Sequence, residues 1–433
     1  MNFYIFNSDN HAMNDLPNSP RFLRWLAATV FTGILVVIIF VIAIDPYRLY
    51  GFIEYRGLNA VKPGLGRYQN EIKLLQGAKA RPNAFIMGNS RAEIGFDPDV
   101  PEFHQHNLTA YNFAIPGIGI DTVSKQLDFL AYEDIQPKFI LLGMEFLDFI
   151  VLSQQLAEPS SKVGQSLNFR EISDKWFWKF DVLFSLASVA DAIRTILIQR
   201  DVEAPTMTAK GFNPLNQYKP IARSAGYNKL FQQRAQENAE VYLRKANGSI
   251  SLNDFDSLRV IFDITAPSNG TINLIIYPYH SQILALFEET GLWPIFVEWK
   301  RLLINEISAA QKRHSHINIK LYDFSGYSRY NCERIPSLGD RESTTNWYWE
   351  AGHFKKALGD IVLARILNIS IPLALTADGN MGGFLSQFGF ELDESNLNDN
   401  EERIRQERSL CMRDYPELFT ETRSLVDAVR SKN

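Results

Sequence analysis

The hydrophobic pattern of the chain begins with one long apolar run. Residues 25–44, from Trp25 to Ile44, contain no charged side chain. About 20 residues at a rise of about 1.5 Å each match a hydrocarbon core about 30 Å thick. A cleaved signal peptide would have a shorter apolar run, and a buried helix of a soluble protein would show a polar face. The run therefore predicts one uncleaved transmembrane anchor, preceded by a leader over residues 1–24.

The charges that flank the anchor do not fix its topology. Arg21 and Arg24 precede the run, whereas Arg48, Arg56 and Lys62 follow it. The distribution of positive charge therefore favours neither direction. Long domains cross a membrane largely regardless of such charges, so the bulk of the chain can lie outside the cytoplasm.

After the anchor, short apolar runs alternate with amphipathic segments. The runs predicted as strands are Ala84–Met87, Ala110–Ile115, Pro137–Gly143, Ile272–Pro278 and Ile317–Asp323. Strands separated by helices indicate a parallel sheet with helices on both faces. Near-continuous apolar strands indicate that this sheet is buried. The predicted fold class is α/β, a three-layer sandwich around a five-stranded parallel sheet, over residues 45–372.

Two regions depart from this alternation. Residues 152–250 contain helical segments and a loop rich in Pro, Thr, Asn and Gly at residues 201–220, and they predict a helical insertion that forms a lid or wall over a site. Residues 373–433 lose the sheet pattern and include a strongly charged stretch at residues 396–408. We expect this tail to be a peripheral helical appendage.

Composition removes several classes of function. The formal net charge of −5 argues against a nucleic-acid surface. Two cysteines, Cys332 and Cys411, exclude a disulfide-dense scaffold and a paired-cysteine metal site. They can form one disulfide or stay as free thiols. The sequence has no phosphate-binding loop, no dinucleotide fingerprint and no compact cluster of metal ligands, so we expect no metal and no cofactor.

Candidate chemistry begins where the first predicted strand ends. Gly88 stops this strand, and Asn89, Ser90 and Arg91 lead into a helix. A serine on a sharp turn between strand and helix is typical of hydrolase nucleophiles. On this stretch alone, an ordinary turn in which Ser90 caps the helix is the better reading. Further candidates follow later strands, at the edge where parallel sheets bind ligands; these are Gly117, Gly143, His280 and Asp323.

The chain has seven histidines, and His353 is the strongest candidate for a catalytic base. Glu350 precedes it by three residues, just before the last predicted helix at residues 354–367. This spacing allows the two side chains to meet, so that the carboxylate can fix the imidazole tautomer and stabilise the imidazolium. The alternative is a local capping arrangement at the start of the helix. His280 is a candidate substrate contact, with a structural role as its alternative.

The order of these motifs resembles the SGNH (GDSL-like) hydrolase superfamily. Ser90 stands where the family has its serine after the first strand, and Gly117 stands where a glycine donates to the oxyanion hole. Glu350-x-x-His353 stands where an Asp-x-x-His block supplies the base and its orienting acid. The resemblance covers about residues 80–370. It implies a flavodoxin-like sheet and serine-dependent acyl-ester chemistry, as an O-acyltransferase or an esterase.

The apolar anchor, the Gly-Asn-Ser-Arg block and the Trp-Glu-x-x-His-Phe block are similar to membrane-anchored bacterial members of that superfamily. These relate loosely to the alginate O-acetylation proteins and to the D-alanyl transfer protein of teichoic acid synthesis. The resemblance implies a single-pass protein of the inner membrane with its main domain in the periplasm. It also implies an envelope polysaccharide or glycoconjugate as substrate and a membrane-bound acyl-donor protein as partner.

The sequence departs from the family pattern at three positions. Asn89 and Glu350 each replace the usual aspartate. Gly143-Met144-Glu145 stands where Gly-x-Asn normally supplies a third oxyanion donor, and a carboxylate cannot donate unless it is protonated. Arg91, or a group on the insertion, is the candidate replacement. The absence of this third donor also supports an alternative function. In that alternative the protein is a catalytically inactive module that binds polysaccharide or an assembly partner through the aromatic residues 347–349.

Overall fold

The computed structural model describes residues 19–51, 54–152, 185–369 and 388–432. The predictions for most of the leader, for the insertion segment 153–184 and for the tail segment 370–387 concern residues that lie outside the described ranges.

The predicted α/β class is confirmed, with one more strand than expected. The sheet contains six strands in the order β10-β7-β6-β3-β1-β2. All five predicted strands form and run parallel. The sixth, β10, pairs antiparallel with β7, so the sheet is mixed. The strands are β1 (Ala84–Met87), β2 (Ala110–Asn112), β3 (Phe139–Met144), β6 (Thr271–Ile276), β7 (Asn318–Asp323) and β10 (Phe390–Leu392).

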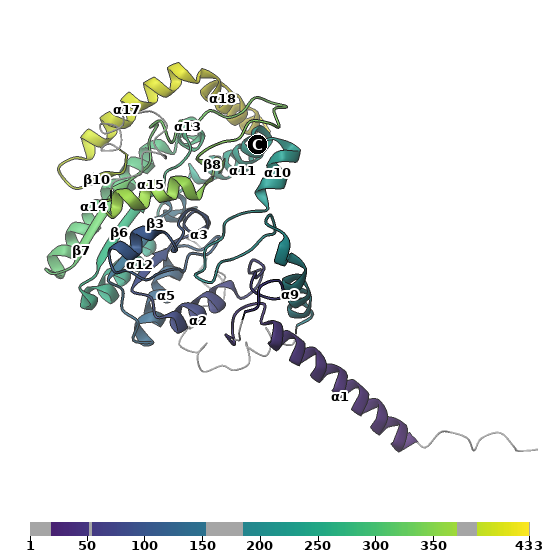
Figure 1. Ribbon diagram of the computed structural model, residues 1–433. Helices are drawn as coiled ribbons and strands as arrows, with labels where there is room; N and C mark the ends of the chain where they lie inside the picture. Colours follow the sequence, from purple (N-terminus) through teal and green to yellow (C-terminus); the bar gives the residue numbers. More distant parts are fainter. Residues whose placement is uncertain (1–18, 52–53, 153–184, 370–387, 433) are drawn as a thin grey trace, which may run out of the picture.

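Helices cover the sheet in two layers (Figure 1). In one layer α12 contacts both α5 and α14, and α2 contacts α5; in the other, α3 contacts α15. β1 and β3 are buried at every position, as expected for central strands covered on both faces, and the edge strand β2 is buried as well. The helices are α2 (Gln69–Ala80), α3 (Ser90–Gly95), α4 (Pro101–Gln105), α5 (Ile120–Tyr132), α12 (Leu252–Thr265), α13 (Ser281–Thr290), α14 (Trp293–Arg313) and α15 (Lys356–Ile366).

The insertion leaves the sheet domain and returns to it at one place. The short strands β4 (Ile150–Val151) and β5 (Ser249–Ile250) pair antiparallel at its base. Its described helices are α9 (Leu186–Leu197), α10 (Tyr218–Ala225) and α11 (Tyr227–Lys245). α11 packs against α13 and against β8 (Tyr348–Glu350), which forms a hairpin with β9 (His353–Phe354). The insertion therefore reaches the segment that carries the candidate base.

The prediction of a peripheral tail is wrong. After contributing β10, the tail forms α17 (Leu397–Asp414) and α18 (Pro416–Arg430). α18 packs on α11 and α13, and the buried apolar side chains of both tail helices belong to the main hydrophobic core. A disulfide between Cys332 and Cys411 ties α17 to the loop after β7.

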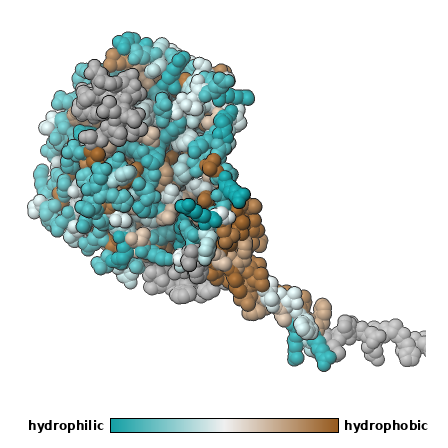
Figure 2. All heavy atoms as spheres, in the orientation of Figure 1, coloured by the Kyte–Doolittle hydropathy of each residue, from teal (hydrophilic) through white to brown (hydrophobic). Residues whose placement is uncertain are grey.

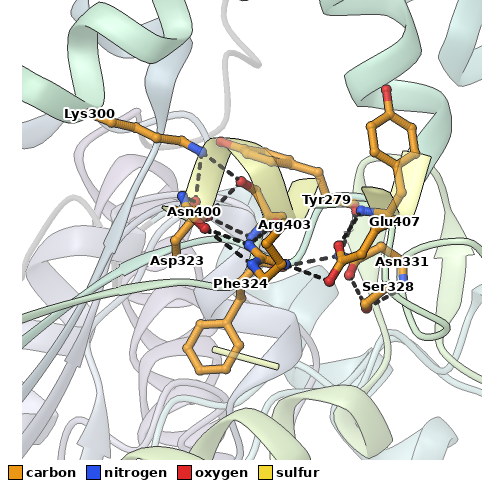
Figure 3. A network of polar contacts seen from close by, with 11 residues as sticks. Tyr279, Lys300, Asp323, Phe324, Ser328, Asn331, Asn400, Arg403 and Glu407 are labelled. Atoms are coloured by element: carbon orange, nitrogen blue, oxygen red, sulfur yellow. Dashed lines mark hydrogen bonds and ion pairs between the residues drawn. The ribbon is translucent and has the colours of Figure 1, made fainter. Parts of the chain in front are cut away.

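A buried polar network fixes the tail to the carboxyl end of β7 (Figure 3). Lys300 Nζ and Asn400 Nδ2 both donate to Asp323 Oδ2, at 2.6 and 2.7 Å. Arg403 Nη2 donates to the carbonyl oxygen of Ser325 at 3.1 Å. Burial alone would raise the pKa of Asp323, but Lys300 and Arg403 lower it. Asp323, which the strand pattern placed among the candidate site residues, is thus committed to holding α17.

The N-terminal helix α1 (Ser19–Ile44) projects from the body of the protein (Figure 1). Its segment Pro20–Ile44 is long and apolar enough to cross a membrane, and little of it is buried against the rest of the chain. This agrees with the predicted anchor, and the carboxyl end of the helix contacts the body through α9 and through Lys62.

Candidate active site

The turn after β1 presents Ser90 without using its hydroxyl as a cap. Gly88 has φ of 135°, and a Cβ there would lie 2.5 Å from the hydroxyl oxygen of Tyr277, so this position requires glycine. Asn89 is the N-cap of α3, and its Oδ1 accepts the N–H of Arg91 at 3.1 Å. The capping role that the sequence offered for Ser90 therefore belongs to its neighbour, and asparagine serves it well.

Ser90, His353 and Glu350 form a hydrogen-bonded relay. Ser90 Oγ lies 2.8 Å from His353 Nε2, within the range of about 2.6–3.2 Å for a nucleophile and its base. His353 Nδ1 is hydrogen-bonded to Glu350 Oε1. Nucleophile and base are 263 residues apart in the chain. The hairpin of β8 and β9 brings Glu350 and His353 to the start of α3, because β9 packs on that helix.

Glu350 is buried and ionised. Burial alone would raise its pKa, but His353, Arg234 and the N–H of Gly352 lower it to about 2. Its Oε2 accepts the N–H of Gly352 at 2.6 Å and lies 3.1 Å from Arg234 Nε. An ionised carboxylate only accepts hydrogen bonds, so His353 carries its hydrogen on Nδ1. Nε2 is then free to accept the proton of Ser90.

The sequence did not reveal Arg234. This residue lies on α11 of the insertion, 116 residues before Glu350 in the numbering, and no spacing connects the two. Its guanidinium also donates to Glu237 at 2.9 Å, one turn along the same helix. The insertion thus places a positive charge beside the carboxylate of the relay.

Glu145 is an acceptor in this structure and cannot provide the missing oxyanion donor. Its carboxylate forms an ion pair with Arg91 and accepts from Asn89 Nδ2 and from the Tyr279 hydroxyl, each at 3.3 Å. The Arg91 guanidinium also lies over the rings of Tyr277 and Tyr279. Arg91 therefore neutralises Glu145 instead of replacing the donor, and Asn89 is turned toward the same carboxylate.

Two backbone N–H groups are available near Ser90. The first is that of Ser90 itself, which stands at the first position of α3, where N–H groups have no partner within the helix. The second is that of Gly117, which is exposed and has φ of 74°. Ile115 N–H donates to the carbonyl oxygen of Gly88 at 3.0 Å, so the loop of Gly117 lies against the turn of Ser90.

A small cavity opens beside these two turns. It is lined by residues 88–89 of the serine turn, 118–120 of the Gly117 loop and 143–145 at the end of β3. At Gly143 a side chain would clash with the ring of Tyr277. Gly88 and Gly143, which are both buried, thus leave room for the Tyr277 side chain beside the turn that carries Ser90.

A buried ion pair anchors the helix that begins with Ser90. Lys73 on α2 and Glu93 on α3 are fully buried and joined at 2.8 Å. Lys73 Nζ also donates to the carbonyl oxygen of Ala114 at 2.5 Å, and Asn213 donates to Glu93 at 3.3 Å. Burial lowers the pKa of Lys73 although Glu93 opposes the shift. The pair fixes α3 relative to the Gly117 loop and to the insertion, and the sequence pattern did not identify it.

His280 is not a substrate contact. It has no exposed surface and caps α13, because its Nδ1 accepts the N–H of Gln282 at 3.2 Å. Its Nε2 donates to the carbonyl oxygen of Glu333 at 2.9 Å. Burial lowers the pKa of His280 to about 4, so the ring is neutral at neutral pH. The structural alternative for this residue is the one that the structure supports.

The aromatic segment 347–349 does not form an open platform. Tyr348 and Trp349 are buried, and the Tyr348 hydroxyl donates to the carbonyl oxygen of Pro278 at 3.0 Å. Trp349 contacts the ring of Tyr218 and the ammonium of Lys355. Of the three aromatic residues, Trp347 alone is partly exposed.

Comparison of the chain with protein-family models, curated proteins and solved structures gave no match. Among the described residues, no group of three or more His, Cys, Asp or Glu side chains is placed to hold a metal ion. Functional inference for this chain therefore depends on the geometry of the site.

Proposed function

We propose that the protein carries out serine-dependent acyl-ester chemistry, as an O-acyltransferase or an esterase of the SGNH type. The observation that carries this proposal is the distance of 2.8 Å between Ser90 Oγ and His353 Nε2, with Glu350 bonded to the opposite ring nitrogen. A nucleophile, a base that reaches it and an acid that orients the base are the arrangement that serine hydrolases typically use for this chemistry.

Each residue has a defined step in the proposed reaction. Ser90 Oγ attacks the ester carbonyl carbon while His353 Nε2 takes its proton. His353 then gives that proton to the departing alcohol oxygen, and the acyl group stays on Ser90. In the second half, His353 takes a proton from an acceptor hydroxyl, whose oxygen attacks the acyl carbon. The bond from that carbon to Ser90 Oγ then breaks, and His353 returns the proton to Ser90 Oγ. Glu350 stabilises the imidazolium in both halves.

The oxyanion that forms on the carbonyl oxygen would be held by the backbone N–H groups of Ser90 and Gly117. Removing one oxyanion donor typically costs about 10²–10³ in rate. Because Glu145 provides no third donor, we expect slower turnover than a three-donor site gives. Water as acceptor makes the protein an esterase, and a sugar hydroxyl makes it an O-acyltransferase; the difference lies in which acceptor the pocket admits.

The proposed setting is the bacterial envelope, with α1 in the inner membrane and the main domain in the periplasm. Disulfides persist in oxidising compartments, so the bond between Cys332 and Cys411 supports an extracytoplasmic location for the domain. An envelope polysaccharide is the proposed substrate class, with a membrane protein as acyl donor. These two assignments rest on the resemblance of the sequence motifs to the SGNH superfamily.

The second candidate function is a catalytically inactive module that binds polysaccharide or an assembly partner. The position of Glu145, which accepts where the superfamily donates, favours this alternative. The burial of Tyr348 and Trp349 weighs against it, because buried rings cannot stack on sugars.

A fluorophosphonate probe separates the two functions. Such a probe reacts covalently with an activated serine, so we expect labelling of the detergent-solubilised full chain. Ser90→Ala should abolish labelling, and His353→Ala should reduce its rate by at least about 10²-fold, the lower range of general-base contributions. Ser185→Ala, which changes another serine at a helix start, is the matched control. Absence of labelling in a folded wild-type protein that binds glycan would establish the inactive module.

A further inference from the structure

The helix α9 exposes an apolar stripe that the proposed chemistry does not use. Leu186 is 89% exposed, Ile193 is 48% exposed and Leu197 is 74% exposed. At about 100° per residue these positions fall on one face of the helix, with Ala190 between them. Single exposed apolar side chains are normal, but an aligned row over the whole length of a helix indicates a contact surface.

The opposite face of α9 packs on the carboxyl end of α1. Ala192 forms a small buried cluster with Val41 and Ile44, and partly buried apolar side chains of both helices surround it. The Tyr47 hydroxyl, just after α1, donates to Asp191 Oδ2 at 2.6 Å. Burial and Asp191 both raise the pKa of Tyr47, so the hydroxyl stays protonated and keeps this bond. The two helices are thus joined by apolar and polar contacts.

The end of α1 is also fixed to the body. The buried Lys62 Nζ donates to the carbonyl oxygen of Ile44 at 2.8 Å, where a helix terminus favours a cation. The Asp45 carboxylate accepts the N–H of Leu49 at 2.8 Å and thereby orders the turn that follows. α1 therefore meets the body at a defined angle, and the depth of α1 in a membrane would also set the depth of α9.

That depth corresponds to the bilayer interface. α9 contacts α1 around Val41 and Ile44, in the last turn of the apolar run, and one turn covers about 5 Å. Interfacial helices bury their apolar face about 5–10 Å into the boundary between headgroups and acyl chains. Figure 2 shows that the apolar surface of α1 continues without a break onto the adjacent surface of the body. Arg194 and Arg200 are exposed near the stripe, where cations meet lipid phosphates.

We infer that α9 is a second membrane contact, which lies in the interfacial layer of the bilayer that α1 crosses. Leu186, Ile193 and Leu197 enter the lipid, while Arg194 and Arg200 remain at the headgroups. Two linked contacts hold the body, and with it the site, at one orientation relative to the membrane surface. The inference depends on α1 as a membrane anchor and is independent of the catalytic proposal.

Site-directed spin labelling of the full chain in phosphatidylethanolamine–phosphatidylglycerol nanodiscs tests this contact. The native cysteines are joined in a disulfide, so a label reacts only with an introduced thiol. Ile193→Cys and Leu197→Cys report on α9. Val36→Cys in α1 is the lipid control, and Leu252→Cys, an exposed leucine on α12, is the aqueous control. The readout is the ratio of collisions with oxygen to collisions with a water-soluble nickel complex.

We expect this ratio at residues 193 and 197 to resemble that at residue 36 and to exceed that at residue 252 several-fold. If the ratio at residues 193 and 197 matches that of the aqueous control at residue 252 while residue 36 shows the high ratio expected in lipid, the inference is overturned and the anchor stands. Labels at 193 and 197 that neither reagent reaches show that protein covers the stripe, and this also overturns it. An aqueous ratio at residue 36 removes its premise.

Discussion

Replacing Glu350 with glutamine removes the negative charge of the relay while preserving the size of the side chain. The carboxylate is not symmetric in its contacts. Oε2 accepts the N–H of Gly352 at 2.6 Å and faces Arg234 Nε at 3.1 Å, whereas Oε1 meets His353 Nδ1. The carbonyl oxygen of the new amide should therefore take the Oε2 position, between two donors. Its NH₂ group is then directed at His353 Nδ1.

This orientation imposes the wrong tautomer on the imidazole. A donor facing His353 Nδ1 moves the ring hydrogen to Nε2, which then cannot accept the proton of Ser90 at 2.8 Å. In serine hydrolases the equivalent acid-to-amide change lowers the rate by about 10⁴, which corresponds to about 5 kcal/mol of transition-state stabilisation. Glu350→Asp keeps the charge but shortens the reach by one methylene, and we expect a smaller loss of about 10–10²-fold.

The assay is the second-order rate constant for fluorophosphonate labelling of Ser90 in the wild type, in Glu350→Gln and in Glu350→Asp. Thermal unfolding of each variant checks that the protein is folded at the assay temperature. A Glu350→Gln variant that reacts within about tenfold of the wild type would refute the argument about the tautomer. Equal losses in the two variants would show that reach, and not charge, is the controlling property.

Three further predictions concern the stability of the fold. Burial lowers the pKa of His280 to about 4 in the folded protein, whereas the pKa of a histidine in an unfolded chain is about 6.5. The unfolded state therefore binds this proton more readily, and the free energy of unfolding falls as the pH drops below about 6.5. His280→Asn keeps a capping acceptor but does not titrate, so it should remove about 2 kcal/mol of the decrease in the free energy of unfolding between pH 7 and pH 5. Chemical denaturation at both pH values measures this decrease, and an unchanged pH dependence would contradict the argument. Replacing Cys332 and Cys411 with serine opens a link spanning 79 residues and should cost about 4.5 kcal/mol on the chain-entropy account. Reductant should also lower the thermal midpoint of the wild type, and no shift would argue against the bond. Lys73→Met leaves the buried Glu93 carboxylate without its partner and should lower the free energy of unfolding by about 3–5 kcal/mol. The double variant Lys73→Met with Glu93→Leu should lose less stability than the single variant. Equal losses in the two variants would mean that the pair does not act as a unit.

The sheet was predictable because its strands are buried on both faces. The apolar runs from Ala84 to Met87 and from Pro137 to Gly143 are short and alternate with amphipathic segments, a pattern typical of a covered parallel sheet. β10 escaped prediction because it has only three residues and lies on the edge, with Glu391 exposed between two apolar neighbours. The tail looked peripheral because charge dominates α17, although Ile404 and Cys411 on its inner face are buried.

The relay was predictable to the extent that its residues are close in sequence or follow a strand. Glu350 and His353 are three residues apart, and Ser90 follows the first strand. Ser90 follows the first predicted strand, and Glu350 and His353 precede the last predicted helix, so their order along the chain was enough to suggest that they meet. Arg234 and Lys73 depend instead on how α11 and α2 pack, and no local pattern encodes that packing. The ion pair of Arg91 with Glu145 likewise became visible only in three dimensions.

The central claim is that Ser90 is a nucleophile activated by His353. The most direct measurement is mass spectrometry of the acid-quenched full chain after brief exposure to p-nitrophenyl acetate, followed by digestion and localisation of the acetyl group. We predict one acetyl group on Ser90 in the wild type, and none at this position in His353→Ala under the same conditions. An unmodified Ser90 in the folded wild type, or equal acetylation of Ser90 in His353→Ala, would contradict the claim.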